Sequence, residues 1–157
     1  MLAEEVGKLL RSKGLTVSVA ESCTGGRLGD MLTDVPGSSD YFLGGVISYS
    51  DNAKVNLLGV KPRTLKAKGA VSEEVAIQMA AGVRTKVGAD IGIGITGIAG
   101  PAGGTPTKPV GLVYVAVSST RSSECSRNVF RGSRSSIKDQ SARKALELLG
   151  EFLERTG

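Results

Sequence analysis

The stretch TVSVAESCTGG, residues 16–26, decides the fold of this chain. Its first half is rich in β-branched residues, which predicts a β-strand over Thr16–Ala20. Two glycines close the stretch, and residues 24–34 have helical character before Pro36 and Gly37 end the run. A strand that passes through a glycine turn into a helix is typical of an α/β protein.

The rest of the chain alternates predicted helices and strands around this unit. Apolar and β-branched runs predict further strands at 42–49, 91–95, 110–117 and 124–131. Periodicity, capping residues and glycine stops predict helices at 2–13, 52–58, 62–69, 73–87 and about 137–152. We expect the strand at 42–49 to be buried, and Asp51 to cap the helix that follows it. The last two strands are joined by a short turn, so we expect them to be antiparallel.

This pattern predicts an α/β sandwich with a mostly parallel sheet of about five strands, folded as one domain over residues 1–157. In such folds, ligands bind beyond the carboxyl ends of the strands. Three glycine-rich or polar joints follow predicted strands, at residues 21–26, 50–54 and 96–104. We therefore expect the chemistry of the chain to gather at one edge of the sheet.

Composition excludes several classes of protein. No apolar run is long enough to span a membrane, and the first helix lacks the features of a secretory signal, so we expect a cytoplasmic protein. The chain has no histidine, and its two cysteines, Cys23 and Cys125, have neither disulfide-framework nor metal-ligand spacing. We therefore expect no metal. The net charge of +5 favours anionic partners, but three Phe, three Tyr and no Trp offer few platforms for stacking nucleic-acid bases.

Ser22 is the first candidate for chemistry. The two glycines after it let the backbone approach a ligand, and the N–H groups that open the following helix are free donors for a phosphate or an oxyanion. Ser22 would then be a nucleophile. The alternative is structural, because Ser22 or Thr24 would also serve as an ordinary helix cap.

A nucleophilic serine needs a base, and without histidine Lys54 is the candidate. It lies about one turn into a predicted helix, where the positive end of the helix dipole disfavours its ammonium form. Loss of water around it would lower its pKa in the same direction. The alternative is an ordinary surface lysine, one of 20 cationic residues in the chain.

Neighbouring residues carry weaker expectations. Tyr49 would orient Lys54 or share its proton, or else be a half-buried aromatic residue. Cys23 is expected to be a small packed thiol. The loop at 97–109 would be either a lid or a long crossover, with Lys108 binding an anion or remaining solvated. The late basic residues form a solvated face or include phosphate ligands; they are Arg127, Arg131, Arg134, Lys138, Arg143 and Lys144.

Five stretches of this chain resemble the CinA C-terminal domain family. They are residues 20–26 (AESCTGG), 36–39 (PGSS), 49–54 (YSDNAK), 69–72 (GAVS), and 97–101 (GIAGP) continuing to 108–111 (KPVG). They occur in the family's order and cover most of the chain, from about Val6 to Leu149.

The resemblance implies a three-layer α/β/α sandwich around a mixed sheet, and a homo-oligomer. It further implies an amidohydrolase of the PncC type, which converts nicotinamide mononucleotide to nicotinic acid mononucleotide and ammonia without a metal or cofactor. The family's serine–lysine pair corresponds to Ser22 and Lys54, with Tyr49 at the nearby tyrosine position. The candidate substrate-binding residues are Cys23, Thr24, Gly25, Gly26, Thr96, Gly97, Gly100, Lys108, Arg131 and Arg134.

The chain departs from the family at one turn. Members often carry an Asp in a Phe-x-Gly-Asp-Arg turn, whereas here Ser133 stands between Gly132 and Arg134. Two other functions stay open from the sequence. One is a non-catalytic domain that binds a pyridine nucleotide or phosphate, and the other is a role with DNA, for which the late basic residues are the only support.

Overall fold

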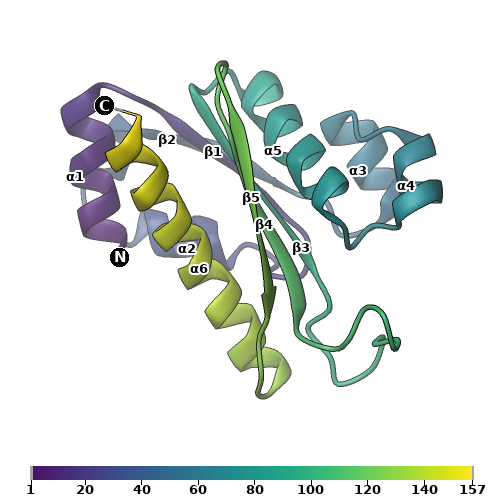
Figure 1. Cartoon of the computed structure of the whole chain (residues 1–157). Coiled ribbons are helices and arrows are strands. Elements are labelled where there is room, and N and C mark those ends of the chain that lie inside the picture. The colour runs from purple at the N-terminus through teal and green to yellow at the C-terminus, as the bar shows by residue number, and fades with distance from the viewer. Residues whose placement is uncertain (1, 157) are drawn as a thin grey trace.

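The structure is a computed structural model, and it describes residues 2–156 as one five-stranded sheet with helices on both faces (Figure 1). The strands, in chain order, are β1 (Val17–Glu21), β2 (Phe42–Ile47), β3 (Ile91–Gly97), β4 (Leu112–Ser118) and β5 (Ser123–Val129). Across the sheet their order is β2-β1-β3-β4-β5. β1 is parallel to both of its neighbours, whereas β3–β4 and β4–β5 are antiparallel. All strands except β4 therefore run in one direction, which confirms the mostly parallel sheet.

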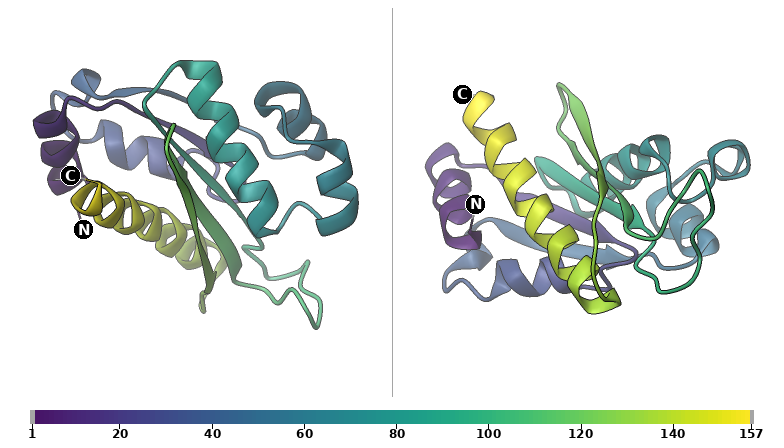
Figure 2. Two further views of the ribbon diagram at one scale, coloured as in Figure 1. Left: turned by 45° about the horizontal axis from the view of Figure 1, so that its top comes forward. Right: turned by 60° about the horizontal axis from the view of Figure 1, so that its bottom comes forward.

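The helices form the two outer layers of a three-layer sandwich. Their bounds are α1 (Ala3–Lys13), α2 (Arg27–Thr33), the 3₁₀ turn η1 (Ser38–Asp40), α3 (Asp51–Leu58), α4 (Pro62–Lys68), α5 (Glu73–Val87) and α6 (Arg134–Arg155). Figure 2 shows α1, α2 and α6 on one face of the sheet and α3, α4 and α5 on the other. The larger apolar core lies under α1, α2 and α6, and smaller clusters lie under α5.

The alternating glycines of β3 allow α5 to pack directly on the sheet. A Cβ added at Gly92 would lie 2.0 Å from the Ala80 carbonyl oxygen, and one at Gly94 would lie 2.4 Å from that of Ala76. Neither distance is possible for real atoms, so larger residues would push the helix away. This confirms the close packing that the Ile-Gly alternation predicts.

A strand forms within residues 42–49, but the prediction that this strand is buried is wrong. β2 is an edge strand that pairs only with β1, and alternate residues along it are exposed, with Leu43 at 46% and Ile47 at 55%. The apolar run gave no sign of the edge position, because apolar residues occur on half-exposed strands as well as in buried ones.

Two predicted helix starts also differ in detail. Ser50, rather than Asp51, caps α3: its hydroxyl accepts the Ala53 N–H at 3.1 Å. α2 begins at Arg27, later than Thr24, because a turn occupies residues 22–26. Within residues 2–156, no helix is both long and apolar enough to cross a membrane.

Candidate active site

Ser22 and Lys54 meet where β1 ends and α3 begins. The Ser22 N–H donates to the Ile95 carbonyl of the neighbouring strand, which fixes the residue beyond the sheet edge. The Lys54 Nζ lies 3.1 Å from the Ser22 Oγ. Both side chains are buried, at 7% exposure for Ser22 and 1% for Lys54. A lysine this buried is not the ordinary surface residue that was the alternative.

Burial shifts Lys54 toward its neutral form. Loss of water on burial lowers the pKa of Lys54 from its ordinary value of 10.5, and the nearby Asp51 carboxylate opposes this shift. The Nζ also lies 2.8 Å from the Ser48 carbonyl oxygen and 3.2 Å from that of Tyr49. A neutral amine has two N–H groups and one lone pair. In the ammonium form the three N–H groups donate to the two carbonyls and to the Ser22 Oγ. In the neutral form the two carbonyls would accept both N–H groups, and the lone pair would face the Ser22 hydroxyl.

Cys23, the residue next to Ser22, is the weaker nucleophile of the two. Burial is the largest cause that raises the pKa of the Cys23 thiol, from 9.0 to about 11. A thiol with this pKa is protonated at neutral pH, and a protonated thiol does not attack. This supports the interpretation of Cys23 as a packed thiol.

The turn after Ser22 requires both of its glycines. Gly25 and Gly26 have φ values of +60° and +107°, a left-handed conformation that other residues adopt only with strain. Neither Ser22 nor Thr24 caps α2 through its side chain, so the capping alternative is wrong. The Thr24 hydroxyl is buried and has no hydrogen-bond partner among the described residues.

The α2 N-terminus is not free to hold a ligand, contrary to the prediction. The Glu21 carboxylate accepts the Gly26 and Leu28 N–H groups at 3.2 and 3.0 Å through Oε1, and that of Gly29 at 2.9 Å through Oε2. No role for Glu21 is predicted from the sequence. Its charge beside a predicted helix start was a signal that could have identified it.

A cavity of about 290 Å³ opens beside the Ser22–Lys54 pair and joins the three predicted loops. Ser22 and Cys23 come from the first joint, Lys54 from the second, and residues 96–100 from the third. The loop after β3 extends beyond the ends of the strands (Figure 1). The described residues that line the cavity are Ser22, Cys23, Tyr49, Lys54, Ala70, Val71, Thr96, Gly97, Ile98, Ala99, Gly100, Ala102, Gly103 and Arg134. The expected gathering of chemistry at one sheet edge is confirmed.

Tyr49 contacts Lys54 through its backbone and not through its hydroxyl. The Tyr49 carbonyl is one of the acceptors of Lys54, whereas its hydroxyl oxygen accepts from the Arg134 Nη2 at 3.2 Å. The ring is 64% exposed. The hydroxyl therefore contacts the cation at the cavity wall and not the serine–lysine pair.

Arg134 is the charged group that faces the cavity besides Lys54, and none of the described lining residues is a carboxylate. Its Nη1 donates to the Gly100 carbonyl at 2.7 Å, which holds the guanidinium against the loop after β3. Ser133, at the position of the family's Asp, caps α6 by accepting the Ser136 N–H. Ser and Asp are both good caps, so the substitution leaves Arg134 at the start of a capped helix.

Several predicted residues lie outside the cavity lining. Lys108 donates through Nζ to the Lys68 carbonyl oxygen at 2.5 Å, and lines a neighbouring groove. Arg131 is exposed, and its carbonyl accepts from Gln140. Gly25 lies near the Lys138 side chain: a Cβ added to Gly25 would be 3.7 Å from the Lys138 Nζ.

Ala70 and Val71 line the cavity but were not predicted to do so, although the stretch 69–72 carries part of the family resemblance.

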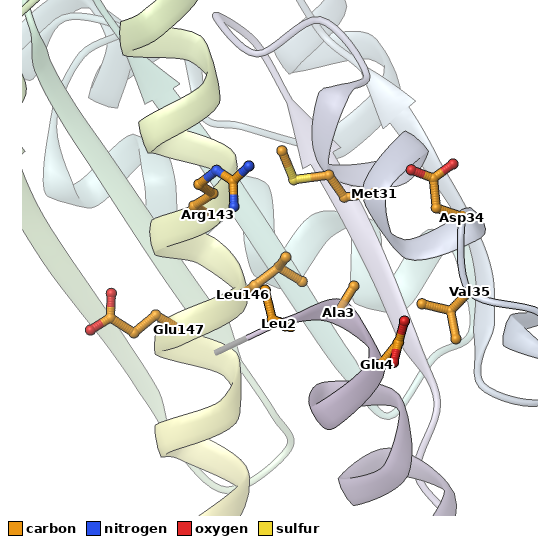
Figure 3. Close-up of a pocket in the computed structure, with 9 residues that line it drawn as sticks. All are labelled: Leu2, Ala3, Glu4, Met31, Asp34, Val35, Arg143, Leu146 and Glu147. Atoms are coloured by element: carbon orange, nitrogen blue, oxygen red, sulfur yellow. The ribbon is translucent and has the colours of Figure 1, made fainter.

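A second cavity, of about 370 Å³, lies between α1, α2 and α6 (Figure 3). Leu2, Met31, Val35 and Leu146 contribute apolar surface, and the charged residues around it are Glu4, Asp34, Arg143 and Glu147. Arg143 pairs with Asp139 on the solvent side of α6, and both side chains are well exposed. Among residues 2–156, no group of three or more His, Cys, Asp or Glu side chains is arranged to hold a metal ion.

The chain is similar in sequence to known proteins over nearly its whole length. The CinA C-terminal domain family matches residues 1–153. A CinA-like protein from Cyanothece sp. is 56% identical over 159 residues, covering 99% of this chain and 38% of that protein. Another, from Trichormus variabilis, is 56% identical over 151 residues, covering 94% and 36%. The chain thus spans little more than a third of the length of these curated relatives.

Solved structures agree with the fold. A CinA superfamily protein from Klebsiella pneumoniae superimposes with a TM-score of 0.94 at 37% identity, covering 98% of this chain and 96% of that one. The competence/damage inducible protein CihA from Agrobacterium tumefaciens gives a TM-score of 0.89 at 37% identity and covers 98% of each chain.

Proposed function

The chain belongs to the CinA C-terminal domain family, and from this premise we propose that it is an amidohydrolase that deamidates nicotinamide mononucleotide. The observation that carries the proposal is the buried contact of 3.1 Å between the Lys54 Nζ and the Ser22 Oγ. A buried lysine whose pKa is lowered by loss of water, and whose Nζ lies beside a serine hydroxyl, has the geometry of a general base and its nucleophile.

The first half of the reaction forms an acyl-enzyme. The Lys54 lone pair accepts the Ser22 proton while the Oγ attacks the carboxamide carbon, and the electron pair of the C=O bond moves onto oxygen. As the tetrahedral intermediate collapses, the Lys54 ammonium gives its proton to the leaving nitrogen. Ammonia departs, and the nicotinoyl group remains as an ester on the Ser22 Oγ.

The second half runs through the same groups. Water attacks the ester carbon and gives a proton to Lys54, which returns it to the Ser22 Oγ as the C–O bond breaks. The product is the carboxylic acid of the nucleotide. One residue thus serves as base and acid in each half, which suits a site whose described residues include no histidine.

Electrostatics favour an anionic substrate. Arg134 faces the cavity and keeps unused N–H donors beyond those that bond Gly100 and Tyr49. A guanidinium is well matched to phosphate, and no carboxylate among the described lining residues would repel one. We therefore assign Arg134 to the phosphate group of the nucleotide. Nicotinamide and its riboside, which lack phosphate, should be poorer substrates.

Ammonia release from nicotinamide mononucleotide tests the proposal. The wild-type protein should release ammonia, and Ser22→Ala should release none above background. Ser12→Ala is the matched control, because the Ser12 hydroxyl bonds the Leu9 carbonyl on the exposed face of α1. Saturable binding of the nucleotide by the wild-type protein without any ammonia would contradict the proposal and favour a non-catalytic nucleotide-binding domain.

A further inference from the structure

Glu21 is a buried carboxylate that takes no part in the proposed reaction. It is the last residue of β1, immediately before Ser22, and is only 1% exposed. It forms no salt bridge with any residue between 2 and 156. A charge buried without a cation costs several kcal/mol unless other groups solvate it. The structure must therefore supply that solvation in another way.

Three backbone N–H groups supply it. Those of Gly26, Leu28 and Gly29 converge on the two carboxylate oxygens at 3.2, 3.0 and 2.9 Å. These donors belong to the N-cap and the first turn of α2, where the helix dipole also favours a negative charge. Glu21 thus occupies the place that a substrate anion would otherwise take.

This arrangement fixes both ends of the turn that carries Ser22. Before the turn, β1 pairs with β2 and β3 on either side up to Glu21. After the turn, the Glu21 side chain reaches past it and holds the start of α2. Residues 22–25 therefore form a loop that is held at its start by strand pairing and at its end by the Glu21 carboxylate.

The same arrangement leaves specific donors unused. The N–H groups of Cys23 and Thr24 donate to no other described residue, and the Cys23 N–H interacts only with its own thiol. The N–H groups of Gly25 and Arg27 instead bond the Ser22 and Thr24 carbonyls. Cys23 follows the proposed nucleophile and lines the cavity. The backbone N–H after a nucleophile is a common oxyanion donor in hydrolases with a strand–turn–helix nucleophile.

We infer that Glu21 is a positioning residue: its carboxylate holds the 22–26 turn so that the Ser22 Oγ faces Lys54 and the Cys23 N–H is free for an oxyanion. The inference rests on the proposed serine–lysine chemistry and deepens it. It places the oxyanion donor at Cys23 in the turn, because Glu21 already occupies the donors of Gly26 and the α2 N-terminus.

Glu21→Gln tests the inference. The amide keeps the shape of the side chain but loses the charge, and places an NH₂ group against one of the backbone donors. The matched control is Asp90→Asn. Asp90 accepts the Thr16 N–H and hydroxyl, both at 2.9 Å, beside the opposite end of β1.

The readout is covalent labelling of Ser22 by a fluorophosphonate, which does not depend on the identity of the natural substrate. In that reaction the Oγ–P bond forms, the P–F bond breaks, the serine proton passes to Lys54 and fluoride leaves. Misplacing a reacting group by about 1 Å costs on the order of 100-fold in rate. We expect Glu21→Gln to label about 100-fold more slowly than wild type, and Asp90→Asn to label at the wild-type rate.

The pH profile of labelling distinguishes loss of positioning by Glu21 from a general collapse of the site in the Glu21→Gln variant. Positioning predicts that Glu21→Gln lowers the plateau rate while the inflection set by Lys54 stays at the same pH. A collapsed site would admit water to Lys54 and move the inflection up toward 10.5. Labelling of Glu21→Gln at the wild-type rate, or an inflection that moves up, would overturn the inference. If the wild-type protein does not label at Ser22 at all, the serine–lysine proposal itself fails.

Amide hydrogen exchange in the wild-type protein provides a test that needs no variant. We expect the Gly26, Leu28 and Gly29 amides to be protected and the Cys23 amide to exchange at least about tenfold faster, because only the former donate to Glu21. Equal protection of Cys23 would overturn the assignment of its N–H as a free donor.

Discussion

Two cavities of this molecule, the one beside Ser22 and Lys54 and the one between α1, α2 and α6, differ in chemistry more than in size. The cavity between α1, α2 and α6 is the larger, at about 370 Å³ against about 290 Å³, and has more charged residues around it. Its Arg143 is paired and exposed to water. In the smaller cavity the buried Lys54 Nζ contacts two backbone carbonyl oxygens and the Ser22 Oγ. Burial of a polar pair, and not cavity volume, is what distinguishes the proposed active site from the larger cavity.

The largest expected effect comes from the serine–lysine pair. Lys54→Met keeps the length of the side chain and removes the base, so kcat for ammonia release should fall by about 1000-fold or more. Ser22→Ala should abolish activity to the same degree, because the two groups act as one unit. Lys86→Met, on the exposed end of α5, is the control. A kcat of Lys54→Met within about tenfold of the wild-type value would contradict proton transfer between the two groups.

Arg134→Gln should have the next largest effect. A hydrogen bond to a charged group contributes about 1.5–3 kcal/mol, which corresponds to roughly a 10- to 100-fold rise in KM for the mononucleotide. Steady-state kinetics should place most of the loss in KM and little in kcat. Arg134→Lys should not restore binding, because the two contacts with Gly100 and Tyr49 need a planar fork. An unchanged KM would remove Arg134 from substrate binding.

Tyr49→Phe should have a smaller effect of the same kind. It removes the hydroxyl that accepts from Arg134 but leaves the backbone carbonyl that accepts from Lys54. A partly exposed hydrogen bond is worth about 0.5–1.5 kcal/mol, so KM should rise by less than about tenfold. A loss in kcat as large as that of Lys54→Met would mean that the hydroxyl takes part in proton transfer.

Arg143→Gln, in the larger cavity, should have the smallest effect. It breaks an exposed pair with Asp139, which contributes about 0.3–0.5 kcal/mol to stability at most. Activity should stay at the wild-type level and the thermal midpoint should shift little. A clear loss of ammonia release would break the contrast between the two cavities.

Much of this molecule could be predicted from the sequence because local patterns determine it. The run of residues 16–26 predicts the strand and glycine turn, and the alternation of Ile and Gly predicts close packing of α5. Ser22 and Lys54 were found because a serine in a glycine turn and a lysine near a helix start are recognisable types. Their contact was a prediction that only a fold could test.

The remainder depends on contacts between distant segments. Nothing local distinguishes β2 as an edge strand, since that depends on how the other strands are ordered. Arg134 reaches Tyr49 from 85 positions away, so the role of the tyrosine hydroxyl could not be inferred from its neighbours. Glu21 was missed because the sequence suggested a free helix N-terminus, and the residue that fills it came from the preceding strand.

The pH dependence of Ser22 labelling by a fluorophosphonate tests the central claim most directly. If neutral Lys54 is the base, the rate should rise with pH as its ammonium form loses a proton, then level off, with an inflection below 10.5 because burial lowers its pKa. Lys54→Met should remove this inflection and slow labelling by about 1000-fold. Labelling of Lys54→Met at the wild-type rate, or a wild-type rate that does not change with pH, would contradict the account.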